Sequence, residues 1–342
     1  MRLSIIVPVY NMAGDGKLQF CMDSLIGQTI SDYEIIAVND ASTDNSLDIL
    51  REYENRYPEK VKVFTYPDNK RQGGAKNVGL EHARGEWIGF IDSDDWVTPD
   101  FYEKLLCCAE KTGADMVGCN YSLVSEHSFE VGQIQQINTF DQTGKLDKER
   151  HKKLLIHPGS MVVKIYKNEV IQKNHLRFPE GIFYEDNCAG PFWSLFFTHF
   201  EKVEEPLYYY YQHNTSTVHH VSVGKCFDRM RAMEYFYDCC MEKGFDKDYA
   251  QEVAYCFVRL FYVNTLFTYM QGVKHPKLDF VKKMRKNTEA RFPEFRQNTY
   301  YNQYVGQEEK SLIEMQCKSD FRFFWYYRVK LLVRKLRRRL GV

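Results

Sequence analysis

The stretch FIDSDDW at Phe90–Trp96 is a hydrophobic run that ends in three carboxylates with one serine among them. In an open α/β sheet, ligands bind beyond the carboxyl ends of the strands, which is where this run delivers its acids. Such close carboxylates repel one another unless a cation lies among them, and oxygen ligands on a short loop suit Mg²⁺ or Mn²⁺. The stretch predicts a metal and diphosphate site, although alone it also fits a solvated turn or helix cap.

The sequence before this stretch alternates between apolar runs and helical segments. Short apolar runs closed by polar residues are typical of buried parallel strands. Such runs occupy Leu3–Asn11, Tyr33–Val38, Val61–Tyr66 and Trp87–Ile91. A helix to about Tyr57 follows the second run, with Ser42 or Thr43 as its N-cap, and a short helix ends between Gly79 and Arg84. The alternation predicts βαβ units and an α/β fold with a mostly parallel central sheet.

Four motifs along these strands, in this order, resemble those of family 2 glycosyltransferases with the GT-A fold. They are SIIVPVYN at 4–11, VNDASTD at 38–44, GGAKNVGL at 73–80 and FIDSDD at 90–95. The resemblance implies a Rossmann-like, nucleotide-diphospho-sugar transferase fold. It also implies inverting sugar transfer of the bacterial surface-polysaccharide type.

The resemblance assigns roles to residues at the motif positions. Pro8–Tyr10 would line the nucleotide base and Asp40 would bind the uracil ring. Asp92 would face the ribose and Asp94 would hold the metal, Mn²⁺ or Mg²⁺. The residues assigned to the nucleotide sugar are Pro8, Val9, Tyr10, Asp40, Lys76, Asn77, Asp92, Ser93, Asp94 and Ser216, and those assigned to the metal are Asp94, Asp92 and His213.

Two motifs depart from the family pattern. The family commonly has Asp-Asp-Gly-Ser where this chain has Asn39–Ser42, and Ala-Arg-Asn where it has Ala75–Asn77. Lys76 can still face a phosphate, but as a point charge without the bidentate fork of arginine. An exposed helix residue is the alternative for Lys76, and the residues leave both open.

A second acid pair, Glu185–Asp186, precedes an apolar run at Cys188–Phe200 that predicts a helix. Acids in a first helical turn commonly complement the macrodipole, so a cap is one interpretation. The pair also resembles the family's acceptor-side motif, which carries the general base of inverting transfer. We expect Asp186 to be the base and Glu185 its neighbour or an acceptor ligand, with the reverse assignment open.

A tyrosine run, Tyr208–Tyr211, has the propensity of a strand. The polar segment after it resembles the family loop that closes over the diphosphate. His213 would bind the metal or a phosphate there and Ser216 would donate a hydroxyl, although a lone histidine is also commonly structural.

The motifs and composition divide the chain into three regions. Residues 1–217 would form the catalytic domain, with a nucleotide-binding half at about 1–124 and an acceptor half at about 125–217. The polar stretch Ser125–Arg150 predicts acceptor-side loops. Residues 218–318 predict a helical region, in which helical spacing is shown by Phe257, Leu260, Phe261, Asn264 and Phe267.

Residues 319–342 predict a basic amphipathic helix. The chain has 46 basic and 46 acidic residues, and 320–342 hold eight of the former and one of the latter; the other 319 residues therefore carry 38 and 45. One face of this helix carries Trp325, Val329, Leu332, Leu336 and Leu340, and the mainly opposite face carries Lys330, Arg334, Arg337 and Arg338. Aromatic, apolar and basic residues in this arrangement favour an anionic membrane surface over nucleic acid or a solvated helix.

The remaining features indicate a cytoplasmic protein, peripheral on the inner face of the cell membrane. No uninterrupted apolar stretch approaches about 18 residues, and no signal cleavage pattern is present. Ten cysteines without zinc-type spacing fit reduced thiols.

Together, the patterns predict a metal-dependent, inverting glycosyltransferase that uses a nucleotide-diphosphate sugar, UDP-linked by resemblance, and a glycan or lipid-linked acceptor. A nucleotidyltransferase that makes a sugar nucleotide is one alternative, although it would carry a glycine-rich, basic phosphate loop after the first strand. A non-catalytic, membrane-associated scaffold that binds nucleotide is the other. The sequence leaves the sugar, the acceptor, the linkage and the oligomeric state open.

Overall fold

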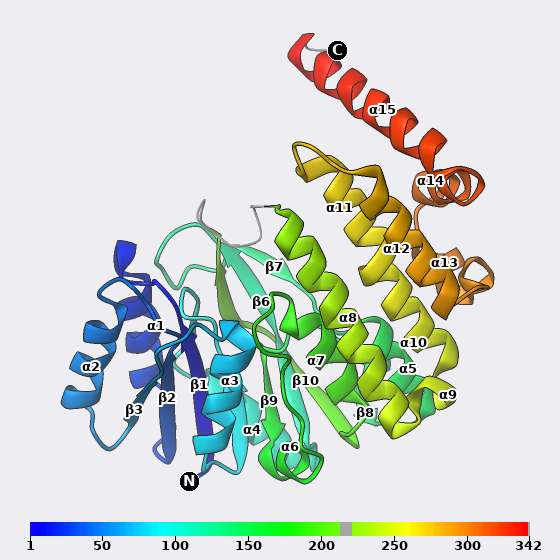
Figure 1. Ribbon diagram of the computed structural model, residues 1–342. Helices are drawn as coiled ribbons and strands as arrows, with labels where there is room; N and C mark the ends of the chain where they lie inside the picture. Colours follow the sequence, from blue (N-terminus) through cyan, green and yellow to red (C-terminus); the bar gives the residue numbers. More distant parts are fainter. Residues whose placement is uncertain (213–220, 341–342) are drawn as a thin grey trace. The chain divides into compact units, whose positions relative to one another are not determined.

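The chain folds as two compact units, Met1–Ser216 and Thr217–Val342, in a computed structural model that describes residues 1–212 and 221–340. The first unit is built on a ten-stranded sheet in the order β3-β2-β1-β4-β9-β6-β10-β5, with β7 paired to β6 and β8 to β10 (Figure 1). The second unit is helical.

The first half of the sheet is parallel. Its strands are β1 (Leu3–Val9), β2 (Tyr33–Asn39), β3 (Val61–Thr65) and β4 (Trp87–Phe90). Every residue of β1 and β2 is buried, as expected of strands covered on both faces. The helices between them are η1 (Gly14–Gly16), α1 (Lys17–Ile26), α2 (Ser46–Arg56) and α3 (Arg71–His82). The predicted βαβ pattern is therefore present.

The start of α2 differs from the prediction. The residue before the helix is Asn45, not Ser42 or Thr43. The Oγ of Ser42 accepts a hydrogen bond from the backbone N of Asn11, and Thr43 N donates to the Asn11 side chain. These two residues therefore join the first two strand-end loops and do not cap the helix.

The second half of the sheet is mixed. Its strands are β5 (Trp96–Val97), β6 (Met116–Val124), β7 (Gln133–Gln135), β8 (Gly144–Lys145), β9 (Lys164–Lys167) and β10 (His199–Tyr211). Strand β9 is antiparallel to β4 and β6, and β10 is parallel to β6. The helices here are α4 (Phe101–Thr112), α5 (Lys148–Ile156), α6 (Asn168–Lys173) and α7 (Glu185–Ser194).

Helix α7 is shorter than the predicted run to Phe200, because it ends at Ser194 and β10 begins at His199. The Asp115 carboxylate accepts hydrogen bonds from the backbone N atoms of Thr198 and His199. These bonds fix an extended backbone where apolar periodicity alone favoured a helix.

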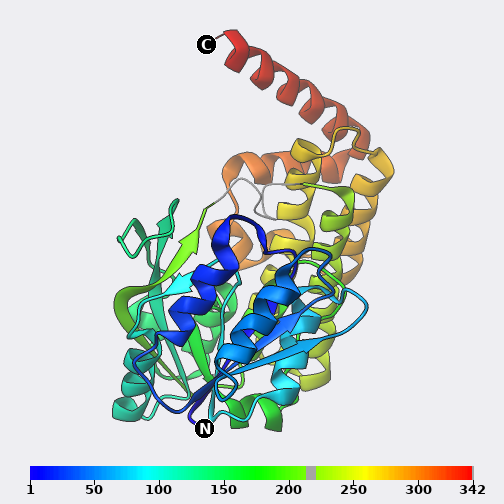
Figure 2. The ribbon, with the colours of Figure 1, turned by 90° about the vertical axis from the view of Figure 1, so that its left-hand side faces the viewer.

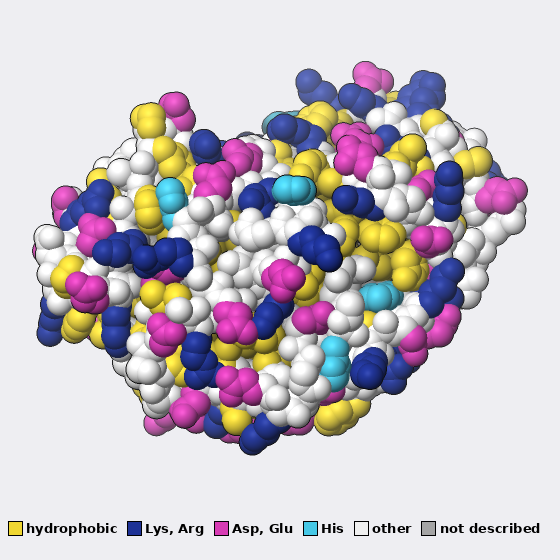
Figure 3. Space-filling view, turned by 90° about the horizontal axis from the view of Figure 1, so that it is seen from below, with side chains coloured by type: hydrophobic (Ala, Val, Ile, Leu, Met, Phe, Trp, Pro, Cys, Tyr) yellow, Lys and Arg dark blue, Asp and Glu magenta, His cyan; other side chains and the backbone are white. Residues whose placement is uncertain are grey.

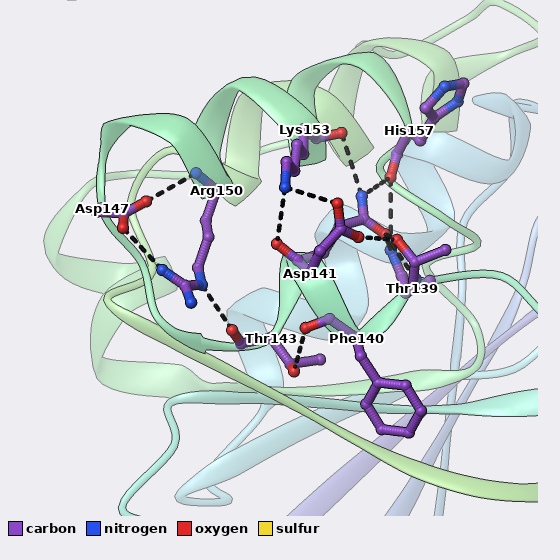
Figure 4. A network of polar contacts seen from close by, with 10 residues as sticks. Thr139, Phe140, Asp141, Thr143, Asp147, Arg150, Lys153 and His157 are labelled. Carbon is purple, nitrogen blue, oxygen red and sulfur yellow. Dashed lines mark hydrogen bonds and ion pairs between the residues drawn. The ribbon is translucent and has the colours of Figure 1, made fainter.

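The segment Ser125–Arg150, predicted as loops, also carries β7, β8 and the turn η2 (Phe140–Gln142). Figure 4 shows how polar contacts hold it to α5: Asp147 caps the helix by accepting from Arg150 N at 2.9 Å. Lys153 forms an ion pair with Asp141 at 2.6 Å. These contacts give the segment a fixed conformation.

The second unit begins with α8 (Val223–Lys243), where Ser222 provides the N-cap. The elements after it are α9 (Phe245–Asp248), α10 (Ala250–Phe257), the π-helix η4 (Val258–Asn264), α11 (Thr265–Gly272), α12 (Leu278–Arg291), η5 (Phe295–Gln297), α13 (Thr299–Tyr304), α14 (Gln307–Lys318) and α15 (Asp320–Leu340). Of the residues at helical spacing, Phe257, Phe261 and Phe267 are buried, whereas Leu260 and Asn264 are only partly buried. Within the described residues, no helix has the length and apolar character needed to cross a bilayer.

Candidate active site

The acids predicted from the opening stretch leave the sheet at the end of β4. The backbone N of Ile91 bonds to Ile6 O at 3.2 Å, and Asp95 N closes a turn onto Asp92 O at 3.1 Å. Burial raises the pKa of Asp92 to about 7; the positive charge of Lys76 opposes this rise and the negative charge of Asp94 adds to it. The side chain of Gln72 donates to Asp92 Oδ1. Asp92 thus lies where a cation would be stabilised.

Asp95, the third acid of the run, has a structural environment. It is 1% exposed, and its carboxylate accepts hydrogen bonds from the Tyr208 hydroxyl at 2.5 Å and from Tyr211 N at 2.9 Å. Burial raises its pKa well above the usual range. Asp95 therefore ties the acid turn to the end of β10. The predicted His213 and Ser216 follow β10 but lie outside the described residues.

The residues predicted to bind the nucleotide base lie at one edge of the sheet. The register pairs Val9 with Asn39 and Asn39 with Thr65, so the carboxyl ends of β1, β2 and β3 are adjacent. Pro8 and Val9 are buried within β1, whereas Tyr10 just beyond it is 41% exposed. Tyr10 can therefore offer its side chain to a ligand at this edge.

Asp40 is buried at the same edge. Its Oδ1 accepts hydrogen bonds from Lys70 N at 2.7 Å and from the Tyr66 hydroxyl at 2.9 Å, and burial raises its pKa. Ala41 follows with φ of 56°, in the left-handed region that favours glycine. Glycine would adopt this backbone conformation without the strain that Ala41 carries.

A buried ion pair joins helix α3 to helix α7. The Nζ of Lys76 lies 2.8 Å from Glu185 Oε1, and the side chains are 3% and 5% exposed. Burial is the largest single influence and lowers the pKa of Lys76, but the charges of Glu185, Asp92 and Asp186 and the hydrogen bond to Glu185 together outweigh burial, so the pKa is raised. A sequence separation of 109 residues hides this pair from local patterns. Lys76 is therefore not an exposed helix residue, and its predicted role toward a phosphate stays a prediction.

The close approach of the two helices depends on Gly73 and Asn77. A Cβ atom at Gly73 would lie 2.2 Å from the carbonyl oxygen of Pro179. The Asn77 amide exchanges two 2.9 Å hydrogen bonds with the Phe178 backbone and donates to Glu180 at 3.0 Å. Asn77 thus holds the loop that leads to the second acid pair, and its predicted role in donor binding stays a prediction.

Asp186 differs from its buried neighbour. It lies in the first turn of α7 with an exposed side chain, and Asn187 N donates to its Oδ1 at 2.9 Å. Loss of hydration at the carboxyl group raises the pKa of Asp186 to about 6, and the charge of Glu185 adds to the rise. Solvent contact moderates the effect of these charges. An accessible carboxylate with a raised pKa suits a general base.

The donor set of the site fits a divalent cation. Within the described residues, no three His, Cys, Asp or Glu side chains are placed to hold a metal. Mg²⁺ and Mn²⁺ need fewer protein ligands, because one or two carboxylates plus substrate phosphates commonly suffice. Asp92 feels the negative charges of Asp94, Glu185 and Asp186 against the positive charge of Lys76. This excess of negative charge favours a bound cation.

Some residues of the site could not be found from motifs. Gln72 bonds to Asp92, and Tyr208 bonds to Asp95, but neither carries a local signal. Gln72 stands just before the Gly73-Gly74 pair, and glycines mark places where the backbone approaches another segment closely. This position is the nearest thing to a sequence signal for Gln72.

Comparisons with known proteins show the family to which the chain is similar. Residues 4–173 match the family model described as "Glycosyl transferase family 2". The chain is 33% identical over 219 residues to the uncharacterized glycosyltransferase YibD of Escherichia coli K12, covering 63% of this chain and 62% of that protein. It is 35% identical over 222 residues to the putative glycosyltransferase EpsH of Bacillus subtilis 168, with the same coverage of 63% and 62%. The matches span less than two thirds of either relative.

Among solved structures, residues 1–349 of TarS from S. aureus resemble the chain with a TM-score of 0.62 at 18% identity, covering 90% of this chain and 93% of that one. The same fragment has been solved in complex with UDP-GlcNAc. The likeness confirms the predicted GT-A fold, with an α/β sheet and C-terminal helices.

Proposed function

The chain belongs to glycosyl transferase family 2, and on that premise we propose that it moves a sugar, with inversion, from a UDP-linked donor to a hydroxyl of a glycan or lipid-linked acceptor. The different environments of Glu185 and Asp186 carry the proposal, because they leave one accessible carboxylate beside a buried ion pair. UDP as the nucleotide is supported by Asp40 and Tyr10 at the sheet edge and by the UDP-GlcNAc complex of the TarS fragment.

On the donor side, Asp94 and Asp92 would hold Mn²⁺ or Mg²⁺. The cation supplies positive charge against the diphosphate as it departs. Asp95 keeps the acid turn in place through Tyr208 and Tyr211, and Gln72 orients Asp92. His213 and Ser216, which the sequence assigns to the donor site, lie outside the described residues.

On the acceptor side, Asp186 acts as general base. The acceptor oxygen forms its bond to the anomeric carbon while the bond from that carbon to the diphosphate oxygen breaks, and the hydroxyl proton passes to Asp186. Attack from the face opposite the diphosphate gives inversion. Glu185 is unsuited to this task because Lys76 occupies its Oε1 in a buried pair. We therefore assign the base to Asp186 and a positioning role to Glu185.

The nucleotidyltransferase alternative lacks support from the first loop. The segment after β1 is held by Asn11, Met12 and Ala13, whose backbone N atoms donate to the side chains of Ser42 and Asp44 in the next strand-end loop and of Ser46 at the start of α2. Lys17 is almost buried, with its ammonium 3.9 Å from Asp15. This loop does not present a basic, glycine-rich surface to a triphosphate.

The proposal also places the enzyme in the cytoplasm, at the inner face of the cell membrane. A lipid-linked acceptor and the basic α15 support this location, and surface polysaccharide synthesis is the process that it fits.

Two isosteric variants of adjacent acids test the donor side. The chain is incubated with a panel of UDP-sugars and Mn²⁺, and UDP release is measured. Asp94→Asn should lower turnover by at least about 100-fold, since charge at the departing diphosphate is lost. Asp95→Asn is the matched control and should retain most of the activity.

Three results would contradict the proposal. Pyrophosphate release from UTP would favour a nucleotidyltransferase. Full activity of Asp94→Asn would show that Asp94 does not hold a metal needed for transfer. Binding of UDP without turnover, for every sugar and acceptor supplied, would favour the non-catalytic scaffold.

A further inference from the structure

Helix α15 divides into an anchored half and a projecting half. Phe323, Phe324 and Tyr327 are buried, at 0%, 4% and 2% exposure. From Leu332 to Arg337 every residue is exposed. Figures 1 and 2 both show α15 running on past α11 and α14. The part after Tyr327 is about 20 Å long, since a helix rises about 1.5 Å per residue.

The anchored half is fixed by a bidentate ion pair. Arg285 of α12 donates to both carboxylate oxygens of Asp320, at 2.8 and 2.7 Å. Gln316, which is fully buried, donates to the same carboxylate and accepts from the Tyr262 hydroxyl. Both ends of this network lie in packed helices, so the direction of α15 relative to α12 and α14 is held.

The face of α15 opposite its buried side is apolar. We call this face the apolar stripe. It comprises Phe321, Trp325, Val329, Leu332 and Leu336, which are 64%, 48%, 56%, 60% and 56% exposed. Their spacing of three or four residues keeps them on one side of the helix. A contiguous exposed apolar surface of this kind marks an interaction site.

Basic side chains flank the apolar stripe. On one flank, Arg328 lies over the ring of Trp325 at 5.4 Å and Lys335 is exposed; on the other flank, Arg322 is exposed. On the side of the helix away from the apolar stripe, Lys330 and Arg334 form ion pairs with Glu308 of α14 at 2.6 and 2.8 Å. By contrast, Figure 3 shows a face of the molecule on which basic and acidic side chains lie intermixed.

We propose that the projecting half of α15 lies in the interface of an anionic lipid bilayer, with the apolar stripe among the acyl chains and its basic flanks against the headgroups. The inference rests on the membrane location given in the proposed function and adds the residues and the geometry of contact. Charge decides against a second copy, because two α15 helices packed through this stripe would bring their basic flanks together.

Glu308 gives the helix a competing internal partner for two of its cations. Removing the carboxylate by Glu308→Gln raises the net positive charge of this part of the molecule by one and should strengthen binding by up to about fivefold.

Vesicle partition of the full chain tests the inference without any donor sugar. The chain should sediment with vesicles of phosphatidylcholine mixed with phosphatidylglycerol, less so at high salt, and not with phosphatidylcholine alone. The variant with Leu332→Glu and Leu336→Glu should weaken partition by at least about tenfold. Met241→Glu, at a 52% exposed position on α8, is the matched control and should leave partition unchanged.

Tryptophan fluorescence reports insertion directly. Trp87, Trp96 and Trp193 are at most 6% exposed, whereas Trp325 is 48% exposed. Acyl chains brominated near the headgroup should quench Trp325, and Trp325→Phe should remove the quenching. Asp94→Asn should retain quenching, and the stripe variant should retain UDP release, so failure here is distinguishable from failure of the proposed function.

Other occupants give different results. A lipid-free dimer that the stripe variant dissociates would overturn the inference in favour of a second copy. Tighter binding to an RNA oligonucleotide than to anionic vesicles, without quenching by brominated lipid, would overturn it in favour of nucleic acid. Vesicle binding that ignores the stripe variant would also overturn it.

Discussion

Asp94–Asp95 and Glu185–Asp186 are both pairs of adjacent acids, and in each pair one member is buried. Asp95 is 1% exposed and Glu185 is 4% exposed. The two buried acids differ in what binds them. Asp95 accepts from neutral donors, the Tyr208 hydroxyl and the Tyr211 amide, whereas Glu185 accepts from the charged Lys76. A buried acid in this site can therefore serve either as a hydrogen-bond acceptor, as Asp95 does, or as the counter-charge of a buried cation, as Glu185 does.

The largest expected effect is a loss of sugar transfer on substitution of Asp186, the exposed acid of the second pair. Asp186→Asn keeps the shape of the side chain but removes the proton acceptor, so sugar transfer should fall by about 100- to 10,000-fold. Thermal unfolding should be nearly unchanged, since the side chain is exposed. Steady-state transfer with saturating donor measures the first effect and calorimetry the second. Retained activity would move the base to another residue.

Removing the buried counter-charge should cost stability. Glu185→Gln leaves the Lys76 ammonium buried without its partner, which should lower the free energy of unfolding by about 3–5 kcal/mol. Asp95→Asn, the matched control, leaves no buried charge and should change it by about 1 kcal/mol. Denaturant unfolding measures both.

A double variant tests whether the loss of stability comes from the buried charge of Lys76 or from packing. Lys76→Met with Glu185→Leu removes both charges and should recover most of the lost stability, because the buried cation is gone. If the double variant is no more stable than Glu185→Gln, the loss arises from packing and the ion-pair account fails.

The smallest effect concerns pH. Asp186 works as a carboxylate, so activity should be present above its pKa of about 6 and be lost as pH falls through that value. Asp92 has a pKa of about 7, and protons should compete with the metal there. Measuring the pH dependence of the rate at low and high Mn²⁺ separates the two. More Mn²⁺ should shift the step that belongs to Asp92 to lower pH and leave the step that belongs to Asp186 in place. A profile that stays flat to pH 5 would contradict the role of Asp186.

Local patterns predicted much of the catalytic unit. The strands at 3–11 and 87–91 were visible because a buried parallel strand is apolar throughout, and the acids after them followed from the strand ends. The end of α7 at Ser194 could not be predicted from local sequence. The backbone after it is held extended by hydrogen bonds to the Asp115 carboxylate, which is remote in the chain. The cap at Ser42 or Thr43 failed for the same reason, since both side chains bond to Asn11.

The sequence by itself determined which chemical groups gather at the edge of the sheet, because strand periodicity and the polar residues that end each strand are local properties. Tertiary structure alone decided the state of each group. The burial of Glu185 on Lys76, the neutral donors around Asp95 and the exposure of Asp186 depend on segments that are remote in the chain. Hydration and charge at a carboxylate are set by whatever packs around it, and only the folded chain brings those neighbours together.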